Sequence, residues 1–179
     1  DGKGQQLGDV HRHGWGRSRA QSRMRRANGC AKGGSRGIMG SIGSNLQEVK
    51  GRITRACAAA ARDENSVTLL AVSKTFGAEA VREAHAAGQR HFGENYVQEA
   101  LAKIDALADL RSQLQWHLIG PLQSNKTRPV AEAFDWVHSV DRLKIAQRLA
   151  EQRPAWLPPL QLCLQVNISG EASKSGVPP

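Results

Sequence analysis

Lys74 is the residue whose type and position point most directly to covalent chemistry. It directly follows a short, largely apolar run at residues 68–73, which is typical of a buried parallel strand. A lysine at the end of such a strand loses part of its hydration, and this loss favours the neutral, nucleophilic amine. Such an amine condenses with an aldehyde to give a Schiff base. The alternative interpretation is a lysine that extends its ammonium group into solvent.

Polar side chains also follow the later apolar runs, where they could gather at one edge of a sheet. Asn95 and Asn167 are neutral amides that could orient a ligand through hydrogen bonds. His117 lies inside the run at residues 116–119, where a histidine is either a catalytic base or a hydrogen-bonded core group. Glu94 and Glu99 do not favour a paired acid/base site, because Glu99 falls a turn along the following helix. The other polar residues at strand ends are Ser73, Ser139, Asp141 and Ser169.

The usual patterns of phosphate and metal sites are absent from the sequence. There is no glycine-rich phosphate loop, nucleophile elbow or metal-ligand cluster of standard spacing. His11, His13 and Cys30 are too loosely spaced to specify a metal ion. The three cysteines lie far apart, and their odd number argues against a disulfide framework. Cys57 and Cys163 are expected to be buried, reduced thiols.

The elements that must position these residues alternate between helix and strand. A first helix is predicted from Ser44, whose spacing to Gln47 is that of a capping box. Gly88 is expected to end the second helix, and Asp141 is expected to cap the fifth. Strands are predicted to begin near residues 68, 91, 116, 135 and 161. The helices between them are predicted at residues 78–87, 97–108, 126–134 and from 141.

Two of these helices have apolar faces that should pack against a sheet. The predicted inward face of the third helix recurs at helical spacing and consists of Val97, Leu101, Ile104 and Ala108. The predicted inward face of the fifth helix consists of Leu143, Ala146 and Leu149 or Ala150.

The alternation predicts an α/β fold with parallel strands joined by helical crossovers. Two architectures compete. A five-stranded doubly wound sheet fits the number of strands. A TIM-type parallel βα barrel fits the rhythm but needs eight strands and about 250 residues. The chain has 179 residues and stops soon after its fifth strand, so an ending at Pro179 is expected to be a cut.

The charge of the chain is unevenly distributed. The sequence has 25 Lys and Arg against 16 Asp and Glu, a formal charge of +9. Residues 1–38 account for +7 of it and are rich in Gly and Arg, so they are predicted to be disordered. This segment is either a basic arm or upstream sequence that is not native protein, with Met39 as a natural start. Residues 39–179 carry only +2, so they do not predict nucleic-acid binding.

The sequence predicts no association with a membrane. The longest apolar stretch is a run of small residues at 56–61, whereas a spanning helix needs roughly 20 apolar residues. No apolar segment near the start resembles a secretion signal. The expected location is therefore cytoplasmic.

Five motifs in order resemble the pyridoxal phosphate homeostasis protein family. They are LLAVSKT at 69–75, GQRHFGENYVQE at 88–99, WHLIGPLQSNK at 116–126, HSVDR at 138–142, and QVNIS with SKSG within 165–176. Members of that family are single-domain βα barrels similar to the barrel of alanine racemase. The resemblance implies a partial barrel domain over residues 39–179, with about five of the eight strands.

The resemblance also implies a cofactor and its ligands. Lys74 is similar to the family's lysine that forms a Schiff base with pyridoxal 5′-phosphate (PLP), and Asn95, His117 and Asn167 would line the same barrel mouth. The loops at 123–126 and 173–176 lie at that end, where they would either contact the cofactor or stabilise the mouth. The family resembles a PLP carrier that acts without robust turnover and supplies PLP-dependent apoenzymes.

Two alternatives and one expectation about binding strength remain open. A racemase-like enzyme would need an acid/base residue on the opposite face of the cofactor, and Tyr96 is the only tyrosine. Nucleic-acid binding through residues 1–38 would be steeply salt-dependent. In the family, segments around strands seven and eight hold the phosphate at a helix N-terminus. We therefore expect residues 39–179 alone to be poorly stable and to bind PLP weakly.

Overall fold

The structure, a computed structural model, describes residues 41–179. The predicted disorder of residues 1–38 and the start at Met39 lie outside the described residues. The loose group of His11, His13 and Cys30 lies outside them as well.

Five parallel strands form one sheet in which every strand pairs with its neighbour in the sequence. The sheet order is β1-β2-β3-β4-β5. A doubly wound sheet would reverse its direction at a switch point, whereas a barrel keeps this sequential order. The α/β fold with an incomplete parallel βα barrel is therefore confirmed. The strands are β1 (Ala71–Val72), β2 (His91–Glu94), β3 (Gln115–Leu118), β4 (Trp136–Val140) and β5 (Gln161–Leu164).

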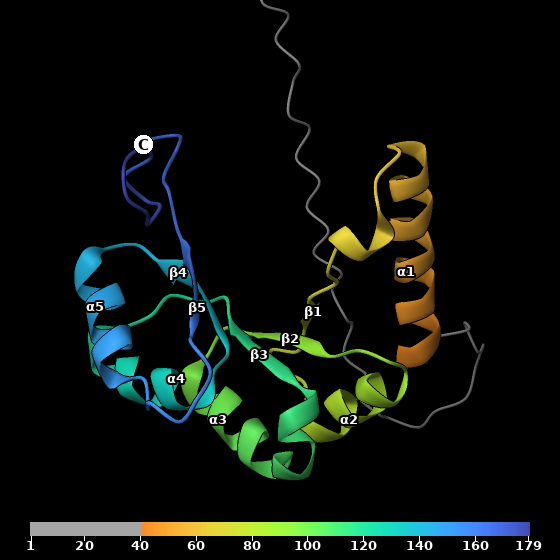
Figure 1. The fold of residues 1–179 in the computed structure, drawn as a ribbon, viewed down its shortest axis with the longest axis horizontal. Coiled ribbons are helices and arrows are strands. Elements are labelled where there is room, and N and C mark those ends of the chain that lie inside the picture. Colours follow the sequence, from red (N-terminus) through yellow and green to blue (C-terminus); the bar gives the residue numbers. More distant parts are fainter. Residues whose placement is uncertain (1–40) are drawn as a thin grey trace, which may run out of the picture.

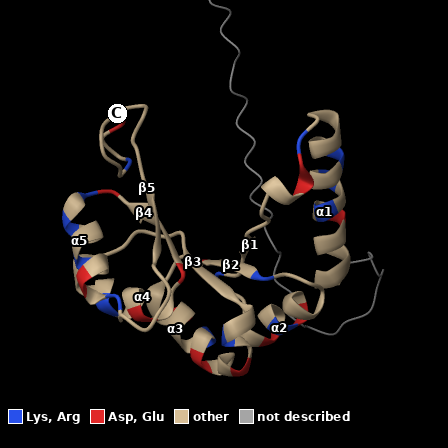
Figure 2. Ribbon diagram, in the orientation of Figure 1, with Lys and Arg blue, Asp and Glu red and all other residues tan. Residues whose placement is uncertain are grey.

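The helices cover the outer side of the curved sheet. In Figure 1, α2 to α5 follow one another along this side, while α1 stands at the β1 end and contacts α2. Figure 2 shows that charged residues recur along the helices. The five α-helices are α1 (Ile42–Ala59), α2 (Ala78–Ala86), α3 (Val97–Ala106), α4 (Thr127–Ala133) and α5 (Leu143–Gln152). Three short 3₁₀ segments are η1 (Glu64–Ser66), η2 (Ala108–Gln113) and η3 (Ser124–Lys126).

The hydrophobic core lies between the sheet and these helices. Large side chains of the strands are buried in it together with aliphatic side chains of α2, α4 and α5. Because burial removes apolar surface from water, it is the main force that fixes the helices on the sheet. The main contributors are Phe92, Trp116, Leu118, Val137, Val81, Val130, Ile145 and Leu149.

The helix starts differ from the predicted ones. Ser41 caps α1, with its Oγ accepting a hydrogen bond from the backbone N–H of Ser44 at 3.2 Å, so the predicted cap at Ser44 is wrong. A serine three residues earlier accepts from one of the orphan N–H groups of the first turn, so the helix begins sooner. The predicted cap at Asp141 is also wrong, because α5 begins after Arg142 without a side-chain cap. Gly88 follows α2 with φ +86°, as predicted for a helix terminator.

The inward faces of two helices agree with the prediction only in part. Leu149 is buried as predicted, and Val97, Ile104 and Ala146 are partly buried against the core. In α5 the buried residues are Ile145 and Leu149, whereas Leu143 is 71% exposed. In α3 the buried residues are Ala100 and Lys103, and the predicted Ala108 is exposed. The apolar pattern alone did not predict Lys103 on the inward face of α3, because that residue is charged.

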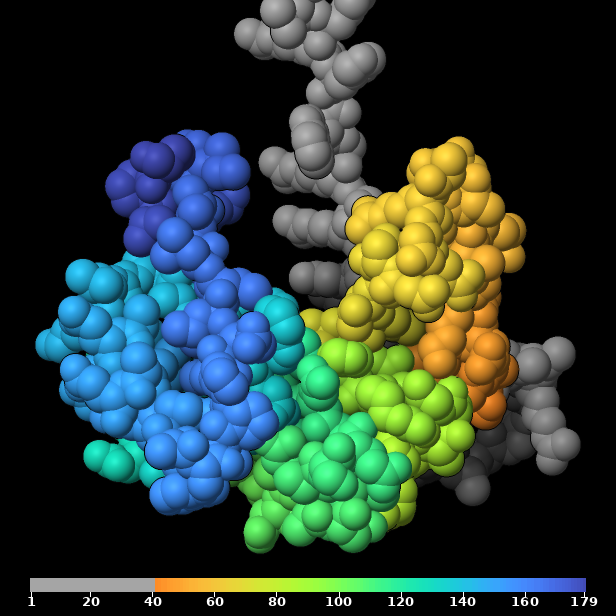
Figure 3. Space-filling model, viewed as in Figure 1, coloured from red at the N-terminus to blue at the C-terminus, as the bar shows by residue number. Residues whose placement is uncertain are grey.

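The inner side of the sheet is open in the described part of the chain. Figure 3 shows a hollow between the segment of α1 and the C-terminal segment. Leu164 and Ile168 are 62% and 84% exposed on and beyond the edge strand β5. Cys57 is buried as predicted, whereas Cys163 is only half-buried on β5. None of the described helices is long and apolar enough to cross a bilayer.

Candidate functional site

The carboxyl edge of the sheet carries the polar residues that the sequence singled out. The register pairs Val72 with Gly93, and Gly93 with His117. Ser73, Lys74 and Asn95 therefore follow directly where their strands end. Lys74 is exposed, so the loss of hydration predicted for it is not present in the structure. Its amine is accessible at the strand end, which is the alternative that the sequence left open.

Lys74 occupies the second position of a tight turn. The backbone N–H of Phe76 donates to the carbonyl of Ser73 at 3.0 Å, which closes the turn over residues 73–76. Thr75 occupies its third position with φ +67°. This position of a type II turn favours glycine, and a β-branched residue there is a conformational outlier. The residue next to Lys74 is therefore held in a conformation that its own backbone disfavours.

A buried ion pair lies beneath this turn. Glu94, at the end of β2, has no exposed surface, and Lys103 on α3 is buried as well. The Nζ of Lys103 donates to Glu94 Oε1 at 2.6 Å and to the Ser73 carbonyl at 2.8 Å. The hydroxyl of Ser73 donates to the same Glu94 oxygen at 2.6 Å. The strand β2 and the helix α3 thus both hold Ser73, the residue that precedes Lys74.

The charge state of Glu94 reflects its burial. Desolvation raises the pKa of this carboxyl above its ordinary value, and the hydrogen bonds from Lys103 and Ser73 oppose that shift. Its second oxygen, Oε2, is buried without a hydrogen-bond partner in the structure. An unsatisfied buried carboxylate oxygen costs stability, so the pair positions the turn at an energetic expense.

Glu99 on α3 holds the residue that follows Lys74. Its Oε1 accepts a hydrogen bond from the Thr75 backbone N–H at 2.6 Å and lies 3.4 Å from Lys103 Nζ. Lys103 therefore joins Glu94 and Glu99, and the two carboxylates are not a free acid/base pair. We call Ser73, Thr75, Glu94, Glu99 and Lys103 the turn brace.

Asn95 lies at the tightest approach between two strand ends. A Cβ added to Gly120 would lie 2.8 Å from both the Cα and the carbonyl carbon of Asn95, and closer still to its oxygen. Only glycine leaves room for the backbone of Asn95 here. The carbonyl of Gly120 accepts a hydrogen bond from Ser139 Oγ at 2.6 Å, so the ends of β2, β3 and β4 are linked.

Asn167 lines a groove at the same edge but uses its amide within its own loop. Its Nδ2 donates to the carbonyls of Glu171 at 2.9 Å and Lys174 at 3.1 Å. The groove has a volume of about 660 Å³ and lies between the ends of β3, β4 and β5. Lys74, Asn95 and His117 are not among its lining residues. Its polar lining comes from Ser139, Asp141, Gln165, Asn167, Ser169, Lys174 and Ser175.

His117 belongs to a row of three histidines that crosses three strands. Its Nε2 lies 3.0 Å from His91 Nδ1, and its Nδ1 lies 2.9 Å from His138 Nε2. Its ring also stacks on Trp136, with the ring centres 5.5 Å apart and the planes at 9°. Both ring nitrogens of His117 are thus occupied. This arrangement matches the alternative interpretation of His117 as a hydrogen-bonded core group. We call His91, His117 and His138 the histidine row.

Burial lowers the pKa of each histidine in the row. Desolvation, with smaller repulsion from His138 and His91, lowers the pKa of His117 to about 3. Burial also lowers the pKa values of His91 and His138. Neutral rings suit the geometry, because each N···N hydrogen bond needs one protonated and one unprotonated nitrogen. The rings form a line rather than a shell, and no metal-binding group exists within residues 41–179.

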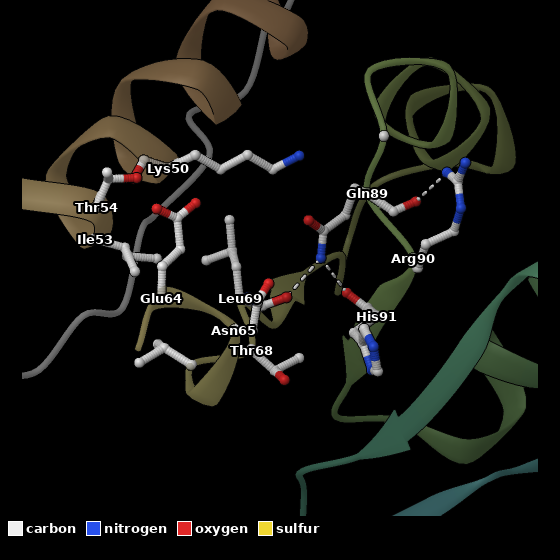
Figure 4. Close-up of a pocket in the computed structure, with 12 residues that line it drawn as sticks. Lys50, Ile53, Thr54, Glu64, Asn65, Thr68, Leu69, Gln89, Arg90 and His91 are labelled. Atoms are coloured by element: carbon white, nitrogen blue, oxygen red, sulfur yellow. Dashed lines mark hydrogen bonds between the residues drawn. The ribbon is translucent and has the colours of Figure 1, made fainter. Parts of the chain in front are cut away.

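A second pocket lies at the opposite edge of the sheet. Figure 4 shows it between α1 and the starts of β1 and β2, with Lys50, Glu64 and Arg90 at its border. The side-chain amide of Gln89 donates to the carbonyls of Leu69 and His91, each at 2.7 Å, and ties the two strand starts together. Functional sites in βα barrels lie at the carboxyl ends of the strands. This pocket of about 340 Å³ lies at the amino ends, where residues serve the stability of the barrel.

The sequence did not predict the turn brace or the histidine row. A signal for Lys103 exists, because it lies at helical spacing between Ala100 and Leu107, which are both buried. A lysine in such a row needs a buried carboxylate partner, and Glu94 is the buried one. The loop at 123–126 is closed by a hydrogen bond of its own, with Lys126 N–H donating to the Gln123 carbonyl at 2.9 Å.

Comparison with known proteins places this fold in a family. The family described as "Alanine racemase, N-terminal domain" matches residues 44–179. A Pseudomonas aeruginosa protein named pyridoxal phosphate homeostasis protein is 69% identical over 141 residues, which are 79% of this chain and 60% of that protein. The Escherichia coli K12 protein of the same name is 56% identical over 140 residues, which cover 78% and 60%. The chain spans about 60% of the length of these relatives.

Solved structures give the same result. PipY of Synechococcus elongatus, in a structure described as having PLP bound, is 48% identical with a TM-score of 0.58. The match covers 70% of this chain and 57% of that one. A protein from Bifidobacterium adolescentis that is described as unknown has a TM-score of 0.69 at 36% identity, and the match covers 76% of this chain and 59% of that one.

Proposed function

This chain belongs to the alanine racemase N-terminal domain family, and we propose that it binds PLP through Lys74. The observation that carries the proposal is the place of Lys74 at the carboxyl edge of the sheet. Its amine is exposed there in a turn whose flanking residues are both fixed by hydrogen bonds. A relative that is 48% identical is described with PLP bound.

The residues at this edge fit the chemistry of PLP. PLP carries an aldehyde, which condenses reversibly with a primary amine with loss of one water molecule. Lys74 supplies that amine as a Schiff-base partner. Asn95, His117 and Asn167 are proposed as residues around the cofactor, with Asn167 the one that lines the groove. His117 would contact the cofactor through the face of its ring, since both of its nitrogens are already hydrogen-bonded to other histidines.

The proposed role is that of a PLP carrier in intracellular vitamin B6 homeostasis. Reversible imine formation sequesters a reactive aldehyde without consuming it. The recipients would be PLP-dependent apoenzymes, and the site of action would be the cytoplasm. We assign this role to the barrel domain at residues 39–179.

Trapping the imine tests the proposal. The chain is incubated with PLP, reduced with borohydride, and mapped by mass spectrometry alongside Lys74→Ala. Lys144→Ala is the matched control, because Lys144 is exposed on α5. We expect label on Lys74 that the control retains and Lys74→Ala loses. Label scattered evenly over the surface lysines of the wild-type chain would contradict the assignment.

The racemase alternative predicts turnover of an amino acid by the same chain. Tyr96 is 60% exposed directly after Asn95, but no described contact joins it to Lys74. Turnover of an amino acid that depends on both Lys74 and Tyr96 would favour an enzyme over a carrier. We expect no such turnover, and a chiral assay of alanine with PLP present measures it.

A further inference from the structure

We propose that Glu99 is a positioning residue that sets the direction of Lys74 by holding Thr75 in its left-handed conformation. This inference rests on the proposed function of Lys74 as the PLP-binding lysine. It concerns a residue that does not itself touch the cofactor, and it follows from the contacts of the turn brace.

The conformation of Thr75 is the central observation. A β-branched residue with φ +67° lies in a region that non-glycine residues rarely occupy. Such outliers persist only where the surroundings over-determine them, and they cluster at functional sites. Because Thr75 directly follows Lys74, a return of Thr75 to extended backbone would redirect the chain at the lysine.

Glu99 is the group that fixes this conformation. Its carboxylate accepts the Thr75 N–H at 2.6 Å, a short charge-assisted hydrogen bond. Lys103, which is buried against Glu94 at 2.6 Å, lies 3.4 Å from the same Glu99 oxygen and holds it in place. The preceding residue, Ser73, is anchored separately by Glu94 and Lys103. Loss of Glu99 would therefore free only the Thr75 side of the turn.

The position of Glu99 makes the inference testable without unfolding the protein. Its side chain is 34% exposed, whereas those of Glu94 and Lys103 are almost fully buried. Glu99→Gln keeps an oxygen that can accept the Thr75 N–H, and Glu99→Leu removes it. Glu132→Leu is the matched control, since Glu132 is an exposed helical glutamate whose nearest cation, Arg128, lies 4.0 Å away.

A double-mutant cycle with Thr75→Gly isolates the conformational effect. Glycine adopts positive φ without steric cost, so the turn of this variant no longer depends on Glu99. The left-handed penalty of an ordinary residue corresponds to a roughly five- to thirtyfold change in population. Coupling between the two positions is the expected signature of positioning.

The experiment measures borohydride trapping of PLP on Lys74 relative to exposed Lys144 in the full chain. We expect Glu99→Leu to lower this ratio about five- to thirtyfold and Glu99→Gln to preserve most of it. In the Thr75→Gly background, Glu99→Leu should change the ratio less than about twofold. A wild-type ratio near one would overturn the PLP assignment and this inference with it. A high wild-type ratio that Glu99→Leu leaves unchanged would overturn the positioning role alone.

A second readout needs no cofactor. Hydrogen exchange of the Thr75 backbone N–H reports the hydrogen bond to Glu99 directly. We expect protection in the wild type, Glu99→Gln and Glu132→Leu, and its loss in Glu99→Leu, with the melting transition retained. Equal protection in Glu99→Leu and the wild type would also overturn the inference.

Discussion

Acid should destabilise this fold through the histidine row. The perturbation is a shift from pH 7 to pH 5, applied to the wild type and to His117→Phe. Phenylalanine keeps an aromatic ring against Trp136 but cannot take up a proton. The comparison therefore isolates the titration of His117 from every carboxylate that titrates in the same range.

The sign follows from the direction of the pKa shift. Burial lowers the pKa of folded His117 to about 3, against about 6.5 for a histidine in the unfolded chain. Between these values the unfolded state holds the proton and the folded state does not, so stability falls as the pH falls. The stabilisation is fully present above about pH 6.5 and disappears progressively toward pH 3.

The magnitude is large for a small fold. Each pH unit inside the window costs about 1.4 kcal/mol, so His117 alone removes about 2 kcal/mol between pH 7 and pH 5. The lowered pKa values of His91 and His138 act in the same direction. The raised pKa of Glu94 has the opposite effect on stability as the pH falls. This effect is the same in the wild type and in His117→Phe, so it cancels in the comparison.

Urea unfolding followed by tryptophan fluorescence at both pH values measures the difference. We expect the wild type to lose about 2 kcal/mol more than His117→Phe on acidification. At pH 7 the variant should be the less stable protein, since it loses both N···N hydrogen bonds. Parallel losses in the two proteins would refute the reasoning, because His117 would then titrate alike in the folded and unfolded states.

Three substitutions test contacts at the ends of the strands. Lys103→Met should cost about 3–5 kcal/mol in urea unfolding, since it leaves the buried Glu94 carboxylate unpaired. Changing Glu94 to Met as well should recover most of that loss, and a single-variant cost below about 1 kcal/mol would contradict the buried pair. Gly120→Ala should cost about 1–3 kcal/mol, because the new Cβ meets the Asn95 backbone, and an unchanged melting temperature would disprove that contact. Arg111→Lys should lower the melting temperature by several degrees, because it loses the two-pronged contact with Asp135 at 2.8 and 3.1 Å; an unchanged value would count against it.

The rhythm of the fold could be predicted from the sequence, because each strand is a short apolar run between helical patterns. The start of β2 was predicted near residue 91, which is where the strand begins in the structure. The order of the strands could not be predicted from that rhythm, since the doubly wound sheet and the barrel share it. Strand order depends on packing between elements, which local patterns do not encode.

The candidate site was predictable only in part, for a related reason. Lys74 could be identified because its neighbours in the sequence are a buried strand and a turn. Glu99 and Thr75 are 24 residues apart, and only the packing of α3 beside the first turn brings them to 2.6 Å. The histidine row likewise needs the register of β2, β3 and β4, in which His117 lies beside Gly93 and Trp136.

The sequential strand order has a consequence for how the molecule is made. The strands begin at residues 71, 91, 115, 136 and 161, and each pairs with the strand that precedes it in the chain. No pairing within this sheet therefore waits for a distant segment, and each step closes only a short loop. As the chain leaves the ribosome, every new βα unit can dock on one that is already folded. Growth of the sheet can thus keep pace with translation, one unit at a time.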